Sequence, residues 1–118
     1  MGIREEAALD AQPEVEPVRA IVCRACGAVV TSPKQAIEID GAHEHTFRNP
    51  AGYSFHVLCY GQAPGVLAAG APTTEACWFA GYAWSLALCQ QCQQHLGWRY
   101  SSAEGPTFHG LIATRLVR

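Results

Sequence analysis

Six cysteines are the side chains of this sequence best suited to metal chemistry. Four of them form two Cys-x-x-Cys pairs, Cys23 with Cys26 and Cys89 with Cys92. This spacing lets one tight turn present two thiolates to the same ion, and two such turns complete the tetrahedral shell that Zn²⁺ prefers. Because four thiolates leave no open coordination position, we expect one structural zinc ion per chain. Gly27 suits the positive φ that these turns often need.

The remaining cysteine chemistry is less specific. A redox-active Cys-x-x-Cys is the alternative interpretation of each pair, but a duplicated pair in a reducing compartment favours zinc. Residues 27–88 separate the two pairs, so the metal would tie together the two ends of a whole domain. Cys59 lies in an alternating run and is expected to be a buried core thiol. Cys77 is adjacent to Trp78.

The second candidate site is aromatic. All three tryptophans, Trp78, Trp84 and Trp98, lie within a short stretch, and the second cysteine pair falls between the last two. Trp98 and Tyr100 are two residues apart and therefore share one face of a strand. An ordinary buried core is one interpretation, and a cage for a flat apolar ligand or a quaternary ammonium is the other. The pattern alone leaves both open.

Composition excludes several classes of function. The chain has a net charge of −2, and 15% of its residues are charged. Without a cluster of Lys and Arg, it has no footprint for nucleic acid. Its longest apolar stretch, around residues 80–89, is too short to span a membrane, and residues 1–6 carry no signal core. We therefore expect a soluble, cytoplasmic protein that binds neither nucleic acid nor membrane.

The elements that must position these residues are strands. Residues 1–19 carry an acidic excess and no periodic apolar face, which predicts a disordered or loosely attached tail before a domain at 20–118. Residues 62–74 are rich in Pro and Gly and are predicted to be mostly loop, with a helical turn near 66–69. Apolar alternation predicts strands within residues 35–40, 54–60, 79–88, 95–102 and 107–117. The expected class is all-β, with antiparallel sheets pinned by zinc.

Three segments make the sequence similar to a known family. Residues 47–53 contain an Asn-Pro-x-Gly turn, residues 73–84 contain Trp-Phe-x-Gly-Tyr-Ala-Trp, and residues 89–100 contain a Cys-x-x-Cys followed by Gly-Trp. In this order and spacing they resemble the thalidomide-binding domain of cereblon, the CULT domain. The resemblance covers roughly residues 20–118, and the layout looks like that of the bacterial single-domain cereblon homologues.

The resemblance implies a fold and a ligand. The fold is a β-tent, in which two antiparallel sheets meet at an angle and a zinc tetrahedron joins them. The ligands are cyclic imides: glutarimide, succinimide, thalidomide-type compounds, and the imides formed at protein C-termini when Asn or Gln cyclises. The imide edge bonds to backbone around Ala76 and Trp78. The positions that match the ligand-binding residues of the family are Asn49, Phe55, Ala76, Trp78, Trp84, Trp98 and Tyr100.

The sequence also departs from the family. Ala76 replaces a His of the human-type pocket, and Ala80 stands where Pro is common. In the eukaryotic protein the domain is the substrate receptor of a ubiquitin ligase. No Lon-like domain or adaptor region matches this chain, so we expect no ligase adaptor as its partner.

Two other functions are alternatives to imide binding. Zinc-bearing methionine-sulfoxide reductases share a similar fold, but they need a nucleophilic Cys after the second pair, and the sequence has none after Cys92. A methyl-ammonium reader would use the tryptophans with acidic residues, of which only Glu75 is close. Glu75 and His95 are expected to be structural or rim residues. The sequence therefore favours a non-catalytic binding module.

Overall fold

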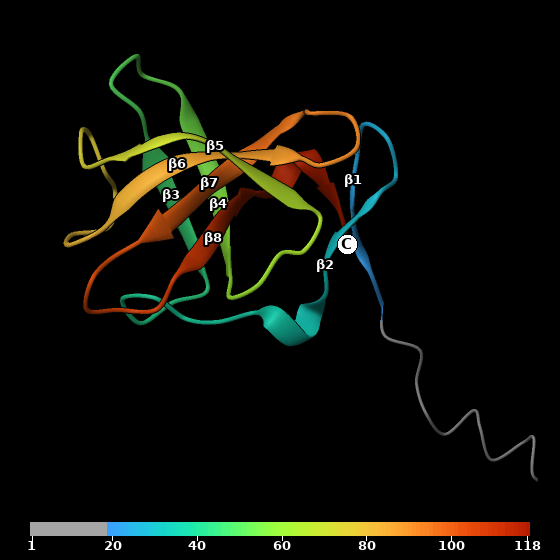
Figure 1. The fold of residues 1–118 in the computed structure, drawn as a ribbon, viewed down its shortest axis with the longest axis horizontal. Coiled ribbons are helices and arrows are strands. Elements are labelled where there is room, and N and C mark those ends of the chain that lie inside the picture. Colours follow the sequence, from blue (N-terminus) through green and yellow to red (C-terminus); the bar gives the residue numbers. More distant parts are fainter. Residues whose placement is uncertain (1–18) are drawn as a thin grey trace, which may run out of the picture.

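A computed structural model describes residues 19–118, and the predicted tail therefore falls almost entirely outside the described residues. A small sheet of three strands lies at one end of the described part (Figure 1). Its strands, in spatial order, are β2 (Val29–Thr31), β1 (Ile21–Cys23) and β9 (Leu116–Val117). The first and last strands of the domain thus pair in one sheet, which closes the fold.

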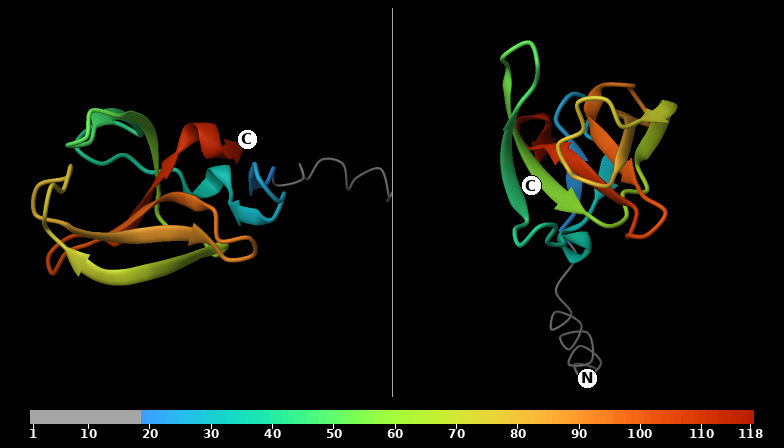
Figure 2. Two further views of the ribbon diagram at one scale, coloured as in Figure 1. Left: turned by 90° about the horizontal axis from the view of Figure 1, so that it is seen from above. Right: turned by 90° about the vertical axis from the view of Figure 1, so that its left-hand side faces the viewer.

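The second sheet has six strands and carries the candidate site. In spatial order they are β3 (Glu44–Arg48), β4 (Ser54–Tyr60), β8 (Phe108–Ile112), β7 (His95–Ser101), β6 (Ala83–Cys89) and β5 (Val66–Thr73). All pairs in both sheets are antiparallel. In the right-hand view of Figure 2 the β3–β4 hairpin stands to one side of the other strands, so the sheet is strongly bent.

Two short 3₁₀ turns are the only helical elements among the described residues, η2 (Pro33–Gln35) and η3 (Ala113–Arg115). The prediction of an all-β fold with two antiparallel sheets is confirmed. Within residues 19–118, no helix is long and apolar enough to cross a membrane.

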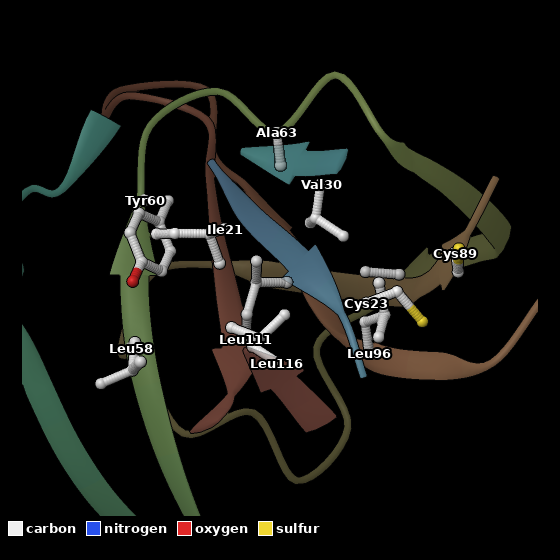
Figure 3. Close-up of a cluster of buried hydrophobic side chains, with 11 residues drawn as sticks. Ile21, Cys23, Val30, Leu58, Tyr60, Ala63, Cys89, Leu96, Leu111 and Leu116 are labelled. Atoms are coloured by element: carbon white, nitrogen blue, oxygen red, sulfur yellow. The ribbon is translucent and has the colours of Figure 1, made fainter. Parts of the chain in front are cut away.

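Two clusters of buried side chains form the core. The first joins both sheets near the cysteine pairs and includes Ile21, Leu58, Leu96, Leu111 and Leu116 (Figure 3). The second lies under the candidate aromatic site and is built on Cys59, Phe79, Tyr100 and Phe108. Cys59 is fully buried, as predicted, and burial raises the pKa of its thiol to about 12.

The strand predicted at residues 35–40 is wrong. Ala36 and Ile39 form only isolated bridges, although Ile37 and Ile39 pack on the second core cluster. The reason is competition for the edge of β4. The strand β3, which the sequence did not reveal, pairs with β4 from Glu44 opposite Leu58 onward, leaving little of that edge for the earlier segment.

The loop predicted at residues 62–74 is also wrong, as is its helical turn, because Val66–Thr73 is β5. This strand is at the edge of its sheet and shifts register between Ala69 and Thr73. Gly70 lies in that irregularity with a φ of 86°, and Pro72 follows it. Edge strands and bulges tolerate Gly and Pro, so residues that signal a loop occur here within a strand. Predicted strand 79–88 also begins later, at Ala83.

Candidate functional site

The two Cys-x-x-Cys pairs lie in turns of the same design. The backbone N–H of Gly27 donates to the carbonyl of Cys23 at 2.7 Å, and the N–H of Gln93 donates to the carbonyl of Cys89 at 2.8 Å. The residue after each second cysteine has a positive φ, 80° at Gly27 and 68° at Gln93. The expectation for Gly27 is confirmed, and Gln93 occupies the equivalent position without being glycine. Each turn therefore directs two thiols to one side.

The four sulfur atoms form one cluster between the two sheets. All four Sγ atoms lie within 4.8 Å of one another. The Sγ atoms of Cys23 and Cys92 are 3.7 Å apart, and those of Cys26 and Cys89 are 3.6 Å apart. A tetrahedron with Zn–S bonds of about 2.3 Å has sulfurs about 3.8 Å apart. The donor set and its spacing therefore fit one zinc ion, which would be held by all four cysteines.

Burial and hydrogen bonding shift the pKa values of three thiols of this cluster, those of Cys23, Cys26 and Cys89. Burial raises the pKa of the Cys23 thiol. For Cys89, burial acts in the same direction, but hydrogen bonds from the backbone of Cys92 and Gln91 and from neighbouring thiols outweigh it and lower the pKa to about 7. Backbone N–H groups that stabilise a thiolate favour the ionised form in which cysteine binds metal.

A cavity of about 410 Å³ opens at the other end of the large sheet. Every predicted ligand-binding residue except Phe55 lines it: Asn49, Ala76, Trp78, Trp84, Trp98 and Tyr100. Trp84 belongs to β6 and Trp98 and Tyr100 to β7, whereas Trp78 belongs to the loop between β5 and β6. The structure thus brings all three tryptophans to a single opening. Pro50 and Glu75 also line the cavity.

Two of the indoles are held by backbone carbonyls. The Nε1–H of Trp84 donates to the carbonyl of Glu75 at 2.8 Å, and that of Trp78 donates to the carbonyl of Arg48 at 3.3 Å. The rings of Trp78 and Trp98 meet edge to face, with centroids 4.8 Å apart. Because these two N–H groups are already bonded, Trp78 and Trp84 offer a ligand mainly apolar ring surface.

Phe55 lies against the outside of this wall. Its ring is 5.5 Å from that of Trp98 and 6.1 Å from that of Trp78. It lines a neighbouring cavity, with Thr46 and His56, and not the tryptophan-lined one. The resemblance implies a ligand-binding position for Phe55, but in this structure its ring packs against Trp98 and Trp78 from outside the cavity.

The base of the cavity is rigid. Tyr100 is buried, stacks on Phe108 with centroids 4.9 Å apart and meets Phe79 edge to face. Burial raises the pKa of its phenol, so the side chain stays neutral. Asn49 is held by its own turn, since its Oδ1 accepts the N–H of Tyr53 at 2.9 Å. The lining is therefore anchored on both the sheet side and the hairpin side.

Two aromatic side chains lie behind the walls of the cavity, Phe47 and His95, and only His95 was predicted as a structural residue. Phe47 stacks on Trp78, and His95 meets Trp98 edge to face at 5.2 Å. Arg115 donates to the carbonyl of His95 at 2.8 Å, which fixes the segment that precedes Trp98. His95 is half-buried, as expected of a structural residue, and burial lowers its pKa. Phe47 begins the segment at residues 47–53 that resembles the family, but no pattern indicated its contact with Trp78, because the strand that carries it was not predicted.

Comparison with known proteins gives a partial match. No family model matches the chain. It is 37% identical to protein cereblon of Danio rerio over 73 residues, which are 58% of this chain and 17% of that protein. It is 39% identical to protein cereblon of Gallus gallus over 56 residues, 48% of this chain and 13% of that protein. For protein cereblon of Drosophila willistoni the identity is 49% over 35 residues, 30% of this chain and 6% of that protein.

The chain thus spans less than a fifth of the length of these relatives. Identities of this size over these stretches support a cereblon-type domain. The four-cysteine cluster and the aromatic cavity are both features of this chain's own structure.

Proposed function

We propose that residues 20–118 form a CULT-type, non-catalytic binding module that holds cyclic imides between Trp78, Trp84 and Trp98. The observation that carries the proposal is the convergence of three indoles, from two strands and one loop, on a cavity of about 410 Å³. Three aromatic walls desolvate a small flat ring and contribute a large contact area at little entropic cost. The similarity to cereblon supports the same assignment.

The loop after β5 supplies polar groups for the imide edge. A cyclic imide presents an acceptor, a donor and an acceptor in a row. Neither the carbonyl of Ala76 nor the N–H of Trp78 forms a hydrogen bond with another described residue, so both are available to a ligand. Ala76 has a φ of 53°, an uncommon conformation for a residue other than glycine, and lines the cavity. Its methyl group adds no polar contact, so backbone carries the recognition.

The ligand class follows from this mixture of surfaces. An open-chain acid would bring a charge into an apolar cage and lose solvation. A cyclic imide is neutral, and its polar edge can be paired. Small cyclic imides and imides at protein C-termini share this chemistry, so we propose both as ligands. Asn49 and Pro50, which belong to one turn, would contact the part of the ligand that leaves the cage.

A methyl-ammonium reader is the second candidate, because Glu75 lines the same cavity. A carboxylate beside aromatic walls attracts a cation. An enzyme has less support. The thiol of Cys77 donates to the carbonyl of Phe79 at 3.4 Å and does not line the cavity, so the geometry does not present it as a nucleophile.

A titration read by tryptophan fluorescence tests the proposal. We expect saturable binding of glutarimide and none of glutaric acid. N-methylglutarimide should bind about tenfold more weakly or worse, because it lacks the donor and leaves a backbone acceptor unpaired. Equal binding of both imides would mean that the cavity is a generic apolar slot. Tight binding of a trimethyl-lysine peptide, with no imide binding, would favour the second candidate.

A further inference from the structure

Trp78 differs from the other two walls in how its ring is held. Trp84 and Trp98 lie on neighbouring strands, whose pairing fixes their backbone: Trp84 is opposite Tyr100, and Trp98 is opposite Leu86. Trp78 lies in the loop that joins β5 to β6 and has no strand partner. The orientation of this wall must therefore come from side-chain contacts.

Those contacts come largely from β3. The ring of Phe47 stacks on the indole of Trp78, with centroids 4.8 Å apart and planes 12° apart. The carbonyl of the next residue, Arg48, accepts the indole N–H at 3.3 Å. Phe47 does not line the cavity, so it covers a part of Trp78 that a ligand does not reach. One strand thus fixes both a ring face and the polar edge of this wall.

Phe47 is itself held from the other side. His45 lies two residues earlier on the same face of β3, and its ring stacks on Phe47 with centroids 5.4 Å apart and planes 5° apart. The Nε2 atom of His45 lies 3.0 Å from the carbonyl oxygens of both Ile39 and Ala42. The edge of Phe79 closes a further side of Phe47 at 5.2 Å. Phe47 is therefore a fixed support for Trp78.

We propose that Phe47 is a positioning residue for the ligand cage: its ring holds Trp78 in the orientation that completes the third wall. The proposal rests on the proposed function, since it assigns a role within the same site. The new element is that a residue outside the cavity, which touches no ligand, affects ligand affinity. A stacked aromatic pair stabilises a structure by more than the apolar area that it buries. If the stack of Phe47 on Trp78 is needed for binding, its loss should weaken ligand affinity about threefold to tenfold.

The first experiment needs no ligand. In ¹⁵N-tryptophan-labelled protein, three indole N–H signals are expected, and the Trp78→Phe variant identifies the one from Trp78. Phe47→Leu keeps an apolar side chain but removes the flat ring. We expect it to shift or broaden the Trp78 signal, and to affect the adjacent Trp98 to a smaller degree, while the signal of Trp84 stays in place. An unchanged Trp78 signal would overturn the proposal.

The second experiment measures glutarimide affinity. Phe47→Leu should weaken binding about threefold to tenfold, and Phe47→Tyr, which restores a flat ring, should recover it. Tyr53→Leu is the matched control, because it makes a similar change at an exposed position of the same hairpin. Leu58→Val, in the other core cluster, controls for lost stability and should leave affinity unchanged.

The outcomes separate the two hypotheses. If the unaltered protein binds no imide, the proposed function fails, and the indole signals still decide whether Phe47 orders Trp78. If the protein binds imide but Phe47→Leu binds equally well, Phe47 is not a positioning residue and the proposed function stands. If Leu58→Val weakens binding as much as Phe47→Leu, the effect is general destabilisation and the proposal is wrong.

Discussion

Removal of the metal should unfold this domain. The four cysteines come from both sheets. Cys23 is the last residue of β1 in the small sheet, and Cys89 is the last residue of β6 in the large sheet. Within residues 19–118 all six cysteines are free thiols, so no disulfide can hold this junction if the ion leaves. Without the ion, the four sulfurs would remain as a partly buried polar cluster joined only by weak contacts between thiols at 3.6 and 3.7 Å.

The size of the effect follows from comparing two free energies. Structural four-ligand zinc sites contribute on the order of 10–16 kcal/mol to folding at neutral pH. A domain of this size is stable by about 5–15 kcal/mol in total. The metal contribution is thus as large as the whole stability, so the metal-free chain should be largely unfolded. Cys23→Ser, which removes one thiolate, should lower stability severely for the same reason.

Elemental analysis and thermal unfolding provide the assay. We expect about one zinc ion per chain, and a strong chelator should abolish the cooperative transition seen by near-UV circular dichroism. Cys59→Ser is the matched control, since Cys59 is equally buried but belongs to the other core cluster. It should retain stoichiometric zinc while losing some stability. A metal-free protein that unfolds at the same temperature as the zinc-loaded one would refute the reasoning.

Further changes test the cage, the turns and the core. Trp84→Ala removes a whole wall, and imide affinity should fall about thirtyfold or more in the fluorescence titration. Gly27→Ala should cost about 1 kcal/mol in urea unfolding, through its φ of 80° alone, because no atom lies within 4 Å of the added carbon. Gln93→Gly, at the equivalent position, should be neutral or stabilising by up to about 1 kcal/mol. Burial lowers the pKa of His109 in the folded protein. As the pH falls, this histidine is therefore protonated in the unfolded chain before it is protonated in the folded one. Stability should therefore fall as the pH drops from about 7 through its folded-state pKa, and His109→Gln should flatten that slope.

The sequence indicated the four-cysteine cluster more clearly than it indicated the strands that carry it. Cysteine spacing encodes a metal geometry directly, and the structure brings all four thiols together. At the cavity, the spacing of the tryptophans left a buried core and a ligand cage as alternatives, and only the resemblance named the lining residues. No sequence pattern showed that Phe55 lies outside the cavity. The surroundings of a strand face depend on the neighbouring strands, which the sequence alone did not give.

The missed strands have a common cause. In residues 35–40 apolar and polar side chains alternate clearly, yet the segment forms no strand. Glu44–Arg48 is made mostly of charged and polar residues, yet it forms strand β3. Local pattern fixes which face a segment buries, but the pairing depends on which segment reaches the free edge of β4. Edge strand β5 was not predicted for a related reason. Its Gly and Pro lie at an irregularity in the pairing with β6, which only the tertiary structure reveals.

The four-cysteine cluster and the cavity lie at the two ends of one hairpin. Strand β6 runs from Trp84, at the cavity, to Cys89, at the metal cluster, and the second cysteine turn leads directly into β7. Leu88 is opposite His95 beside the cluster, the register shifts between Ala87 and Leu88, and the pairing then runs without interruption to Trp84 opposite Tyr100 beside the cavity. A slip of one residue would move every side chain of a strand to the other face. A zinc ion held by the second cysteine turn would close this hairpin beside Leu88 and would help to set the pairing that places Trp84 and Trp98 on the same side.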